Sequence, residues 1–129
     1  MPPKELDLGE SELEVLKALW GNGPATVRQV MDVLHERGRN VAYTTVLTFL
    51  TRLEHKGYVT SNKSGLAYVY KSKVSRHRVA KARLNSVMNQ LFDGAAGAMV
   101  LQLMETERLT PEELGQLREM IQRLDSRTD

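Results

Sequence analysis

Hydrophobic side chains recur at helical spacing in the first third of the chain. Residues 9–23 place four of them on one side of a helical wheel: Leu13, Leu16, Leu19 and Trp20. Residues 24–38 form a second stripe: Val27, Val30, Met31 and Leu34. Ser11 and Thr26 are the expected N-caps of these two helices, and glycines at residues 21–23 and Gly38 are the expected stops.

Residues 42–59, AYTTVLTFLTRLEHKGYV, admit either a strand or a helix. Period two places four side chains on one side of a strand: Tyr43, Leu47, Phe49 and Leu53. The stretch is far longer than an ordinary strand of about five or six residues. A helical wheel instead gathers Val46, Phe49, Leu50 and Leu53. Because Lys56 followed by Gly57 is typical of a helix end, we expect a third helix.

The face of this third helix opposite its apolar stripe carries Thr44, Thr48, Thr51 and His55. Thr45 and Arg52 flank it. Such a surface suits the DNA major groove, because hydroxyls bond phosphates or base edges, methyls pack on thymine, and arginine reaches guanine or phosphate. The alternative is an ordinary solvent face, although solvent faces more often carry Glu, Lys and Gln.

Two β-prone runs follow, at residues 58–60 and 67–70, around the polar turn SNKSG. They predict a hairpin whose loop carries Lys63. Three short helices followed by a hairpin predict a winged helix-turn-helix domain at residues 1–73. The predicted fold class is therefore mainly α with a small β-hairpin wing.

Residues 74–129 predict three further helices, the first capped by Ser75 and the last by Thr110, with Pro111 at its first position and Glu113 at the box position. Their apolar surface exceeds what one such set can bury, so we expect a helical dimerisation domain. The alternative is that this region packs onto its own N-terminal domain. The residues expected at the dimer interface are Leu84, Val87, Leu91, Met99, Leu101, Leu103, Met104, Leu117, Ile121 and Leu124.

Charge is unevenly distributed, although the net charge is only +2. Residues 52–83 hold nine basic side chains and one acidic one, which indicates a polyanionic partner or a merely solvated basic face. There is no cysteine, which excludes disulfides and thiolate sites. No membrane-spanning run, signal peptide, catalytic motif or phosphate-binding glycine loop is recognised, so we expect a cytoplasmic protein that is not an enzyme and needs no cofactor or metal.

Three stretches together, ELEVLKALWGNGPATVRQV, AYTTVLTFLTRLEHKGYV and GLAYVYKSKVSR, resemble the penicillinase-repressor family, also called the BlaI/MecI/CopY repressors. The resemblance runs from about Leu8 to Leu124. It implies a winged-helix repressor, dimeric through its C-terminal helices, that binds inverted repeats containing TACA and TGTA, in the best-known cases at antibiotic-resistance genes. Carried over by position, the family's DNA contacts fall on Thr44, Thr45, Thr48 and Arg52.

This chain departs from the family pattern in two places. The copper-responsive branch uses C-terminal cysteine pairs, which are absent here, so thiolate copper sensing is excluded. The antibiotic-responsive branch is cleaved between an asparagine and a phenylalanine, through an inducing protease system. The matching bond here joins Gln102 and Leu103, a different residue pair, which leaves the inducing signal open.

Two functions follow as hypotheses. The first is a homodimeric repressor that binds double-stranded DNA at an inverted-repeat operator of antibiotic-resistance or cell-wall-stress genes. The second is a winged-helix protein-interaction module without sequence-specific DNA binding. For the first, the residues expected to contact DNA are Arg28, Tyr43, Thr44, Thr45, Thr48, Arg52, Lys56, Lys63 and Lys71.

Overall fold

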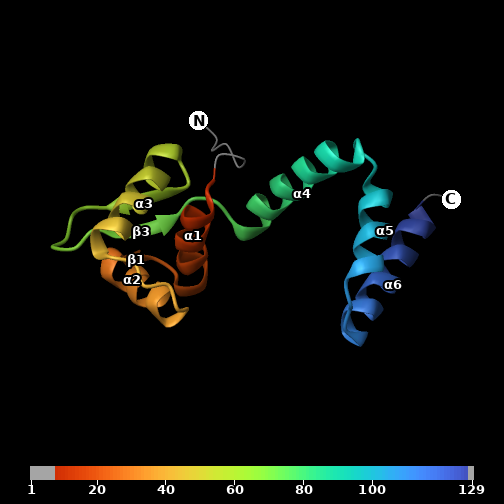
Figure 1. The fold of residues 1–129 in the computed structure, drawn as a ribbon, viewed down its shortest axis with the longest axis horizontal. Coiled ribbons are helices and arrows are strands. Elements are labelled where there is room, and N and C mark those ends of the chain that lie inside the picture. Colours follow the sequence, from red (N-terminus) through yellow and green to blue (C-terminus); the bar gives the residue numbers. More distant parts are fainter. Residues whose placement is uncertain (1–7, 128–129) are drawn as a thin grey trace. The chain divides into compact units, whose positions relative to one another are not determined.

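The computed structural model describes residues 8–127 (Figure 1). They divide into two compact units, and the boundary along the chain falls between Ser86 and Val87. The division falls inside a helix, α4, whereas the sequence predicts a domain boundary ahead of that helix, at residue 73.

The first unit holds three helices, a small sheet and the beginning of α4. Its elements in chain order are α1 (Glu10–Asn22), β1 (Ala25–Thr26), α2 (Val27–Glu36), α3 (Tyr43–Lys56), β2 (Val59–Asn62), β3 (Val69–Ser72) and α4 (Arg76–Phe92). Together with the comparisons below, this arrangement confirms the predicted winged helix-turn-helix fold.

The core of the first unit follows the predicted stripes in part. Leu13, Trp20 and Met31 of those stripes are only partly buried, whereas Val15, which the prediction left out, is fully buried. The largest fully buried side chains come from all three helices and the sheet: Val15, Leu16, Val30, Val46, Leu50, Leu53, Tyr58 and Val59. On α3, burial of Val46, Leu50 and Leu53 confirms the helical interpretation of residues 42–59. Because this side of α3 faces the core, its opposite side faces solvent.

The start of α1 differs from the prediction, because the N-cap is Gly9 and not Ser11. Glu12 occupies the third helical position and its carboxylate accepts the backbone N–H of Gly9 at 3.0 Å. The N–H of Leu13 closes the first turn on the Gly9 carbonyl at 2.9 Å. A cap at Ser11 would leave Glu12 unable to satisfy that amide.

The ends of α2 and α3 largely follow the predicted signals. Thr26 and Gln29 satisfy each other's backbone amides at 3.2 and 2.9 Å, which is a capping box. The α2 helix ends at Glu36, two residues before the predicted Gly38. Gly57 ends α3 in the left-handed conformation, with φ of 89°, and the N–H of Tyr58 bonds the Leu53 carbonyl at 2.9 Å.

The sheet has three strands in the order β1-β3-β2, all antiparallel. The hairpin of β2 and β3 confirms the predicted wing, with its strands shifted by one or two residues from the predicted runs. The sequence does not predict β1, because two residues are too few to carry a period-two pattern. Its pairing of Ala25 with Tyr70 joins the wing to the start of α2.

The second unit begins within α4 and holds α5 (Ala96–Thr106) and α6 (Pro111–Arg127). Asp93 and Gly94, both with positive φ, form the turn after α4. Thr110 and Glu113 make the predicted capping box of α6 at 3.1 and 2.9 Å. Neither α5 nor α6 contains a buried residue, so the apolar side chains of this unit remain largely in contact with solvent.

Candidate nucleic-acid interface

The outward face of α3 carries the side chains that the sequence assigns to DNA. Thr44, Thr45, Thr48 and Arg52 are all exposed. On the opposite side of the helix, Val46, Leu50 and Leu53 are fully buried and Phe49 is partly buried. The expectation that these four residues face solvent is therefore confirmed. Their contact with DNA stays a prediction.

Two threonines of this face donate their hydroxyl protons inward. Thr48 Oγ1 donates to the Thr44 carbonyl at 2.9 Å, and Thr51 Oγ1 donates to the Leu47 carbonyl at 2.8 Å. Each hydroxyl is thus partnered within the helix, by the bond that a mid-helix threonine makes to the carbonyl four residues earlier. What these side chains present to solvent is a methyl group and an oxygen that accepts hydrogen bonds.

Leu47 is a site residue that the sequence reasoning missed. It is exposed, and on the helical wheel it lies next to Thr51 at the edge of the outward face, on the side away from Arg52. Tyr43, which the sequence does assign to DNA, is also exposed at the first position of α3. A leucine at the edge of a polar face was the signal available in the sequence. Its side chain adds apolar area to the threonine methyls.

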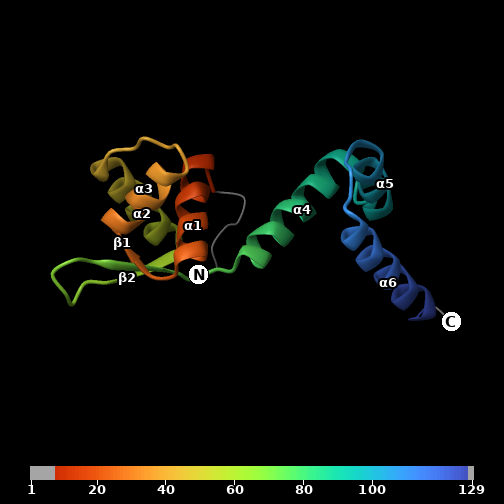
Figure 2. The same cartoon turned by 90° about the horizontal axis from the view of Figure 1, so that it is seen from below.

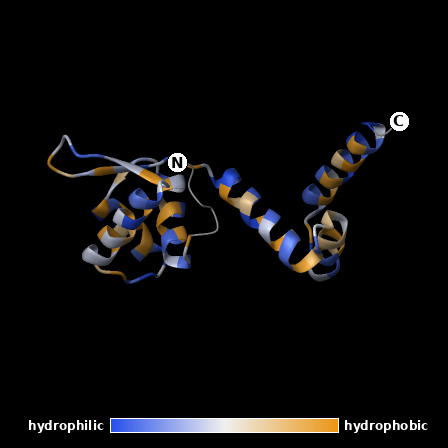
Figure 3. Ribbon diagram, turned by 90° about the horizontal axis from the view of Figure 1, so that it is seen from above, coloured by the Kyte–Doolittle hydropathy of each residue, from blue (hydrophilic) through white to orange (hydrophobic). Residues whose placement is uncertain are grey.

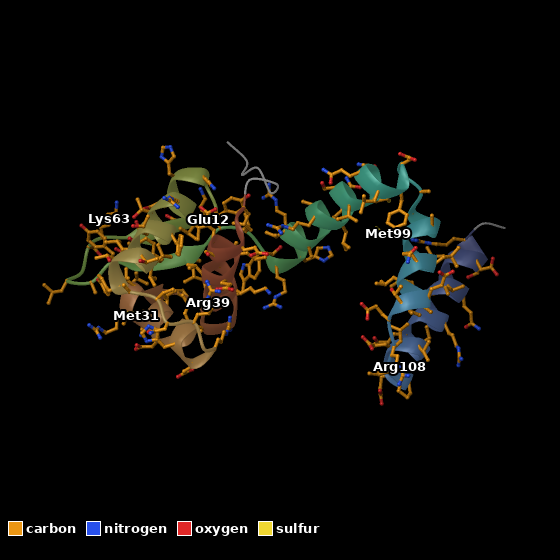
Figure 4. All side chains as sticks on the ribbon, in the orientation of Figure 1. Glu12, Met31, Arg39, Lys63, Met99 and Arg108 are labelled. Atoms are coloured by element: carbon orange, nitrogen blue, oxygen red, sulfur yellow. The ribbon has the colours of Figure 1, made fainter. Side chains whose placement is uncertain are left out.

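Lys56 has a structural partner. Its ammonium lies 2.9 Å from Oε1 of Glu12, a carboxylate that is only 6% exposed (Figure 4). Burial raises the pKa of Glu12, but the Gly9 N–H, the Lys56 ammonium and the charge of Arg52 outweigh burial and hold that pKa below its usual value. We therefore assign Lys56 to the anchoring of α3 and leave it out of the proposed DNA surface.

The wing adds cations beside this face. Lys63 and Lys71 are exposed, and the Lys63 ammonium lies 5.6 Å from the centre of the Tyr68 ring (Figure 4). Arg28 is exposed in the first turn of α2. These three side chains are therefore accessible to a partner, and their contact with DNA phosphates stays a prediction.

Part of the basic run on α4 stabilises the fold instead. The Trp20 indole N–H donates to the Val74 carbonyl at 2.9 Å and to Ser72 Oγ at 3.1 Å. The Arg76 guanidinium lies 5.5 Å from the centre of the same indole ring. Arg83 donates to the Leu8 carbonyl at 2.6 Å. The sequence did not reveal these contacts, because their partners are more than fifty positions apart.

Most of the residues expected at a dimer interface are exposed. Eight of them are large exposed hydrophobics: Leu84, Val87, Leu91, Leu101, Leu103, Met104, Ile121 and Leu124. Met99 and Leu117 are partly buried. Val100 and Met120, which the sequence reasoning did not assign, are exposed as well. A face of this kind remains unpartnered within one chain.

The Gln102–Leu103 bond lies in the middle of α5. Both residues are exposed, and their carbonyls accept the Thr106 hydroxyl at 3.1 and 3.4 Å. The Leu103 carbonyl also accepts the Glu107 N–H at 2.9 Å. The side chains at this candidate proteolytic site are exposed. A protease would have to unwind α5 before the bond could enter an active site as an extended chain.

Within residues 8–127, no three or more His, Asp or Glu side chains gather to hold a metal ion. In the same described range, no helix is both long and apolar enough to cross a bilayer.

Comparison with known proteins places the chain in a family. A model of the penicillinase repressor family matches residues 8–123. Transcriptional regulator BlaI of Mycobacterium tuberculosis is 32% identical over 120 residues, covering 92% of this chain and 86% of that protein. The penicillinase repressor of Bacillus licheniformis is 26% identical over 115 residues, 89% of either chain.

Solved structures agree on the fold. The DNA-binding domain of the repressor BlaI matches with a TM-score of 0.50 at 27% identity, over 58% of this chain and 90% of that domain. The oxidized form of MarR from E. coli matches with a TM-score of 0.51 at 18% identity, over 92% of this chain and 76% of MarR, which is a likeness of fold alone. With the family model spanning nearly all described residues, the chain belongs to the penicillinase repressor family of transcriptional repressors, which are not enzymes.

Proposed function

We propose that this protein is a homodimeric repressor that places α3 in the major groove at each half of an inverted-repeat operator. The observation that carries this proposal is the outward face of α3, where exposed methyl groups and hydrogen-bond acceptors lie beside one arginine on the flank. Relatives named penicillinase repressor and methicillin resistance regulatory protein support antibiotic-resistance or cell-wall-stress genes as targets.

The chemistry of this face selects among base pairs. Thymine presents a methyl group in the major groove, which matches the Thr48 methyl and the exposed Leu47. An oxygen that has already given its proton inward accepts from the amino groups of adenine and cytosine. Arg52 supplies paired donors for guanine O6 and N7. The sides of this surface are completed by Arg28 on α2 and by lysines of the wing, which face phosphates.

Dimerisation supplies the second recognition helix. The exposed apolar side chains of α4, α5 and α6 have no partner in one chain, and burying them in a second copy is favourable by about 25 cal/mol per Å² of apolar surface. A two-fold symmetric pair presents two α3 helices to half-sites about 34 Å apart. The inverted symmetry of the operator follows from that of the dimer.

If a protease ends repression, the Gln102–Leu103 bond is the candidate cleavage site. Cleavage there would detach α6 and the end of α5, which together carry Met104, Ile121 and Leu124. The inducing protease system would then act by weakening the dimer. Intact-mass measurement of the protein from cells treated with a β-lactam checks this step, and an uncut chain in derepressed cells removes it.

Selection from a random duplex library, followed by fluorescence anisotropy on the selected site, tests DNA binding. We expect an inverted repeat and a steep salt dependence. If each subunit neutralises roughly four phosphates, the slope of log K against log salt is about −7 for the dimer. Equal affinity for selected and scrambled duplexes would reject sequence-specific repression and leave the protein-interaction module as the better hypothesis.

A further inference from the structure

The loop between β2 and β3 presents one leucine entirely to solvent. Leu66 is fully exposed, unlike every other large hydrophobic residue in the described part of the first unit. The loop extends away from the helices of that unit (Figure 2), and hydropathy colouring shows a hydrophobic stretch within it (Figure 3). Exposing a leucine side chain to water is unfavourable, so covering Leu66 with a partner lowers the free energy.

Local contacts organise both sides of the loop around this leucine. Asn62 Oδ1 accepts the Ser64 N–H at 3.0 Å and the Ser64 hydroxyl at 2.6 Å. On the other side, Tyr68 is half exposed and carries the Lys63 ammonium against its ring. The segment that holds Leu66 is therefore preorganised at its base, which lowers the entropic cost of binding.

The charge around Leu66 defines the chemistry of its partner. From Val59 to Val74 the chain has three lysines and no acidic residue. Lys63 and Lys71 are both exposed. An anionic partner with an apolar interior fits this combination, and the stacked bases between two phosphate backbones are such a partner.

The wing is also continuous with the face of α3. Ser61 of β2 donates to the Glu54 carboxylate of α3 at 2.5 Å, and the ladder pairs Ser61 with Tyr70 of β3. A duplex lying against the outward face of α3 therefore has its neighbouring groove within reach of the wing. A lipid surface is less favoured, because one leucine buries too little apolar area for stable membrane attachment.

We propose that Leu66 is an apolar wedge that enters the DNA minor groove beside each half-site and partly unstacks one base step. Lys63 and Lys71 hold the flanking phosphates. This inference rests on the proposed function and adds to it a specificity term, because flexible pyrimidine–purine steps are unstacked at lower cost than stiff ones.

The test uses the full-length protein and a fluorescent duplex that carries the inverted repeat selected from the random library. We expect Leu66→Ala to weaken binding roughly tenfold or more, because truncation removes three buried carbons in each subunit. The salt slope should stay unchanged, since no charge is lost. Lys63→Ala should instead flatten the slope by about 0.9 per phosphate contact. Leu66→Met, which keeps the apolar volume, is the matched control and should retain most of the affinity.

A second readout places 2-aminopurine at each position flanking a half-site in turn. Wild-type protein should raise its fluorescence at one step, and Leu66→Ala should not. Equal affinity and equal fluorescence for wild type and Leu66→Ala would overturn the wedge while leaving the repressor function standing. Absence of any duplex binding by wild type would overturn both. Binding to vesicles of phosphatidylglycerol that depends on Leu66 and not on Arg52 would assign the loop to lipid and overturn the wedge.

Discussion

The Lys56 ammonium and the Glu12 carboxylate lie 2.9 Å apart and join the last turn of α3 to the first turn of α1. The same carboxylate oxygen accepts the N–H of Gly9, so one oxygen holds both the N-cap of α1 and the end of α3. The ion pair thus anchors the end of α3 to the start of α1. Its removal should therefore be visible first in stability.

Lys56→Ala is expected to lower the free energy of unfolding by about 1–3 kcal/mol, because it leaves a buried carboxylate with less compensation. Urea denaturation measures this change. Lys17→Ala, which removes an exposed lysine from α1, is the matched control and should stay within about 0.5 kcal/mol of wild type. Equal costs for the two variants would show that the Glu12 pair does not stabilise the fold.

The lowered pKa of Glu12 makes stability depend on pH in a defined direction. The unfolded chain binds a proton at Glu12 more readily than the folded chain does. The contribution of Glu12 is therefore complete above its unfolded pKa, about 4.3, and is lost as pH falls through the lower folded value. Glu12→Gln should cost most near pH 6 and least near about pH 3. A difference from wild type that does not change with pH would contradict this.

Thr48 offers a matched pair of substitutions, because its hydroxyl proton is already bonded within the helix. Where Thr48 faces thymine, which offers its oxygen no amino group, Thr48→Val keeps the methyl contact and should retain most of the affinity for DNA. Thr48→Ser removes the methyl and should lose about 0.8 kcal/mol per subunit. On a duplex with uracil in place of thymine, the loss for Thr48→Ser should disappear. The opposite order of the two variants would mean that the hydroxyl reads the DNA.

Arg52 lies exposed on the flank of the outward face of α3. Arg52→Ala is expected to cost about 1–3 kcal/mol in binding of the selected duplex, since it removes paired hydrogen bonds to guanine. A duplex with 7-deazaguanine lacks the N7 acceptor and should bind wild type more weakly, with less further loss for the variant. Arg118→Ala on α6 is the control. An unchanged affinity for Arg52→Ala would remove this residue from the site.

The sequence predicts the parts of the fold that depend on local periodicity and caps. Residues 42–59 alone predict the burial of Val46, Leu50 and Leu53. They also predict the helix end at Gly57, which is left-handed. Thr26 and Thr110 cap as expected, because each has a Gln or Glu three positions later. Features fixed by tertiary contacts escape this reasoning, such as strand β1, which exists only through its pairing with β3.

The sequence predicts which residues form the candidate site better than it predicts their hydrogen bonds and ion pairs. Exposure of Thr44, Thr48 and Arg52 follows from the helical wheel alone. The direction of the Thr48 hydroxyl does not, because a threonine in a helix has two accessible rotamers. Lys56 looked like a DNA contact because its buried partner, Glu12, lies 44 positions away in the sequence. Long-range ion pairs of this kind leave no periodic signal.

The unpartnered apolar side chains of α4 to α6 give the last prediction. Ile121 is 62% exposed in one chain, so Ile121→Asp places its charge in water while the protein is monomeric. In a two-fold dimer the carboxylate would be buried without a partner, twice, which costs several kcal/mol. Sedimentation velocity should therefore show a dimer for wild type and a monomer for Ile121→Asp at the same concentration. Gln116→Asp adds the same charge to α6 at an exposed polar position and should remain dimeric.

Loss of the dimer should also change DNA binding in a specific way. A monomer occupies one half-site, so the salt slope of Ile121→Asp should fall to about half that of wild type, near −3.5. The slope separates this outcome from simple unfolding, which abolishes binding at every salt concentration. A wild-type protein that sediments as a monomer at tens of micromolar would contradict the dimer. The exposed face of α4 to α6 would then need a different partner, because its leucines and isoleucine cannot all remain in water at no cost.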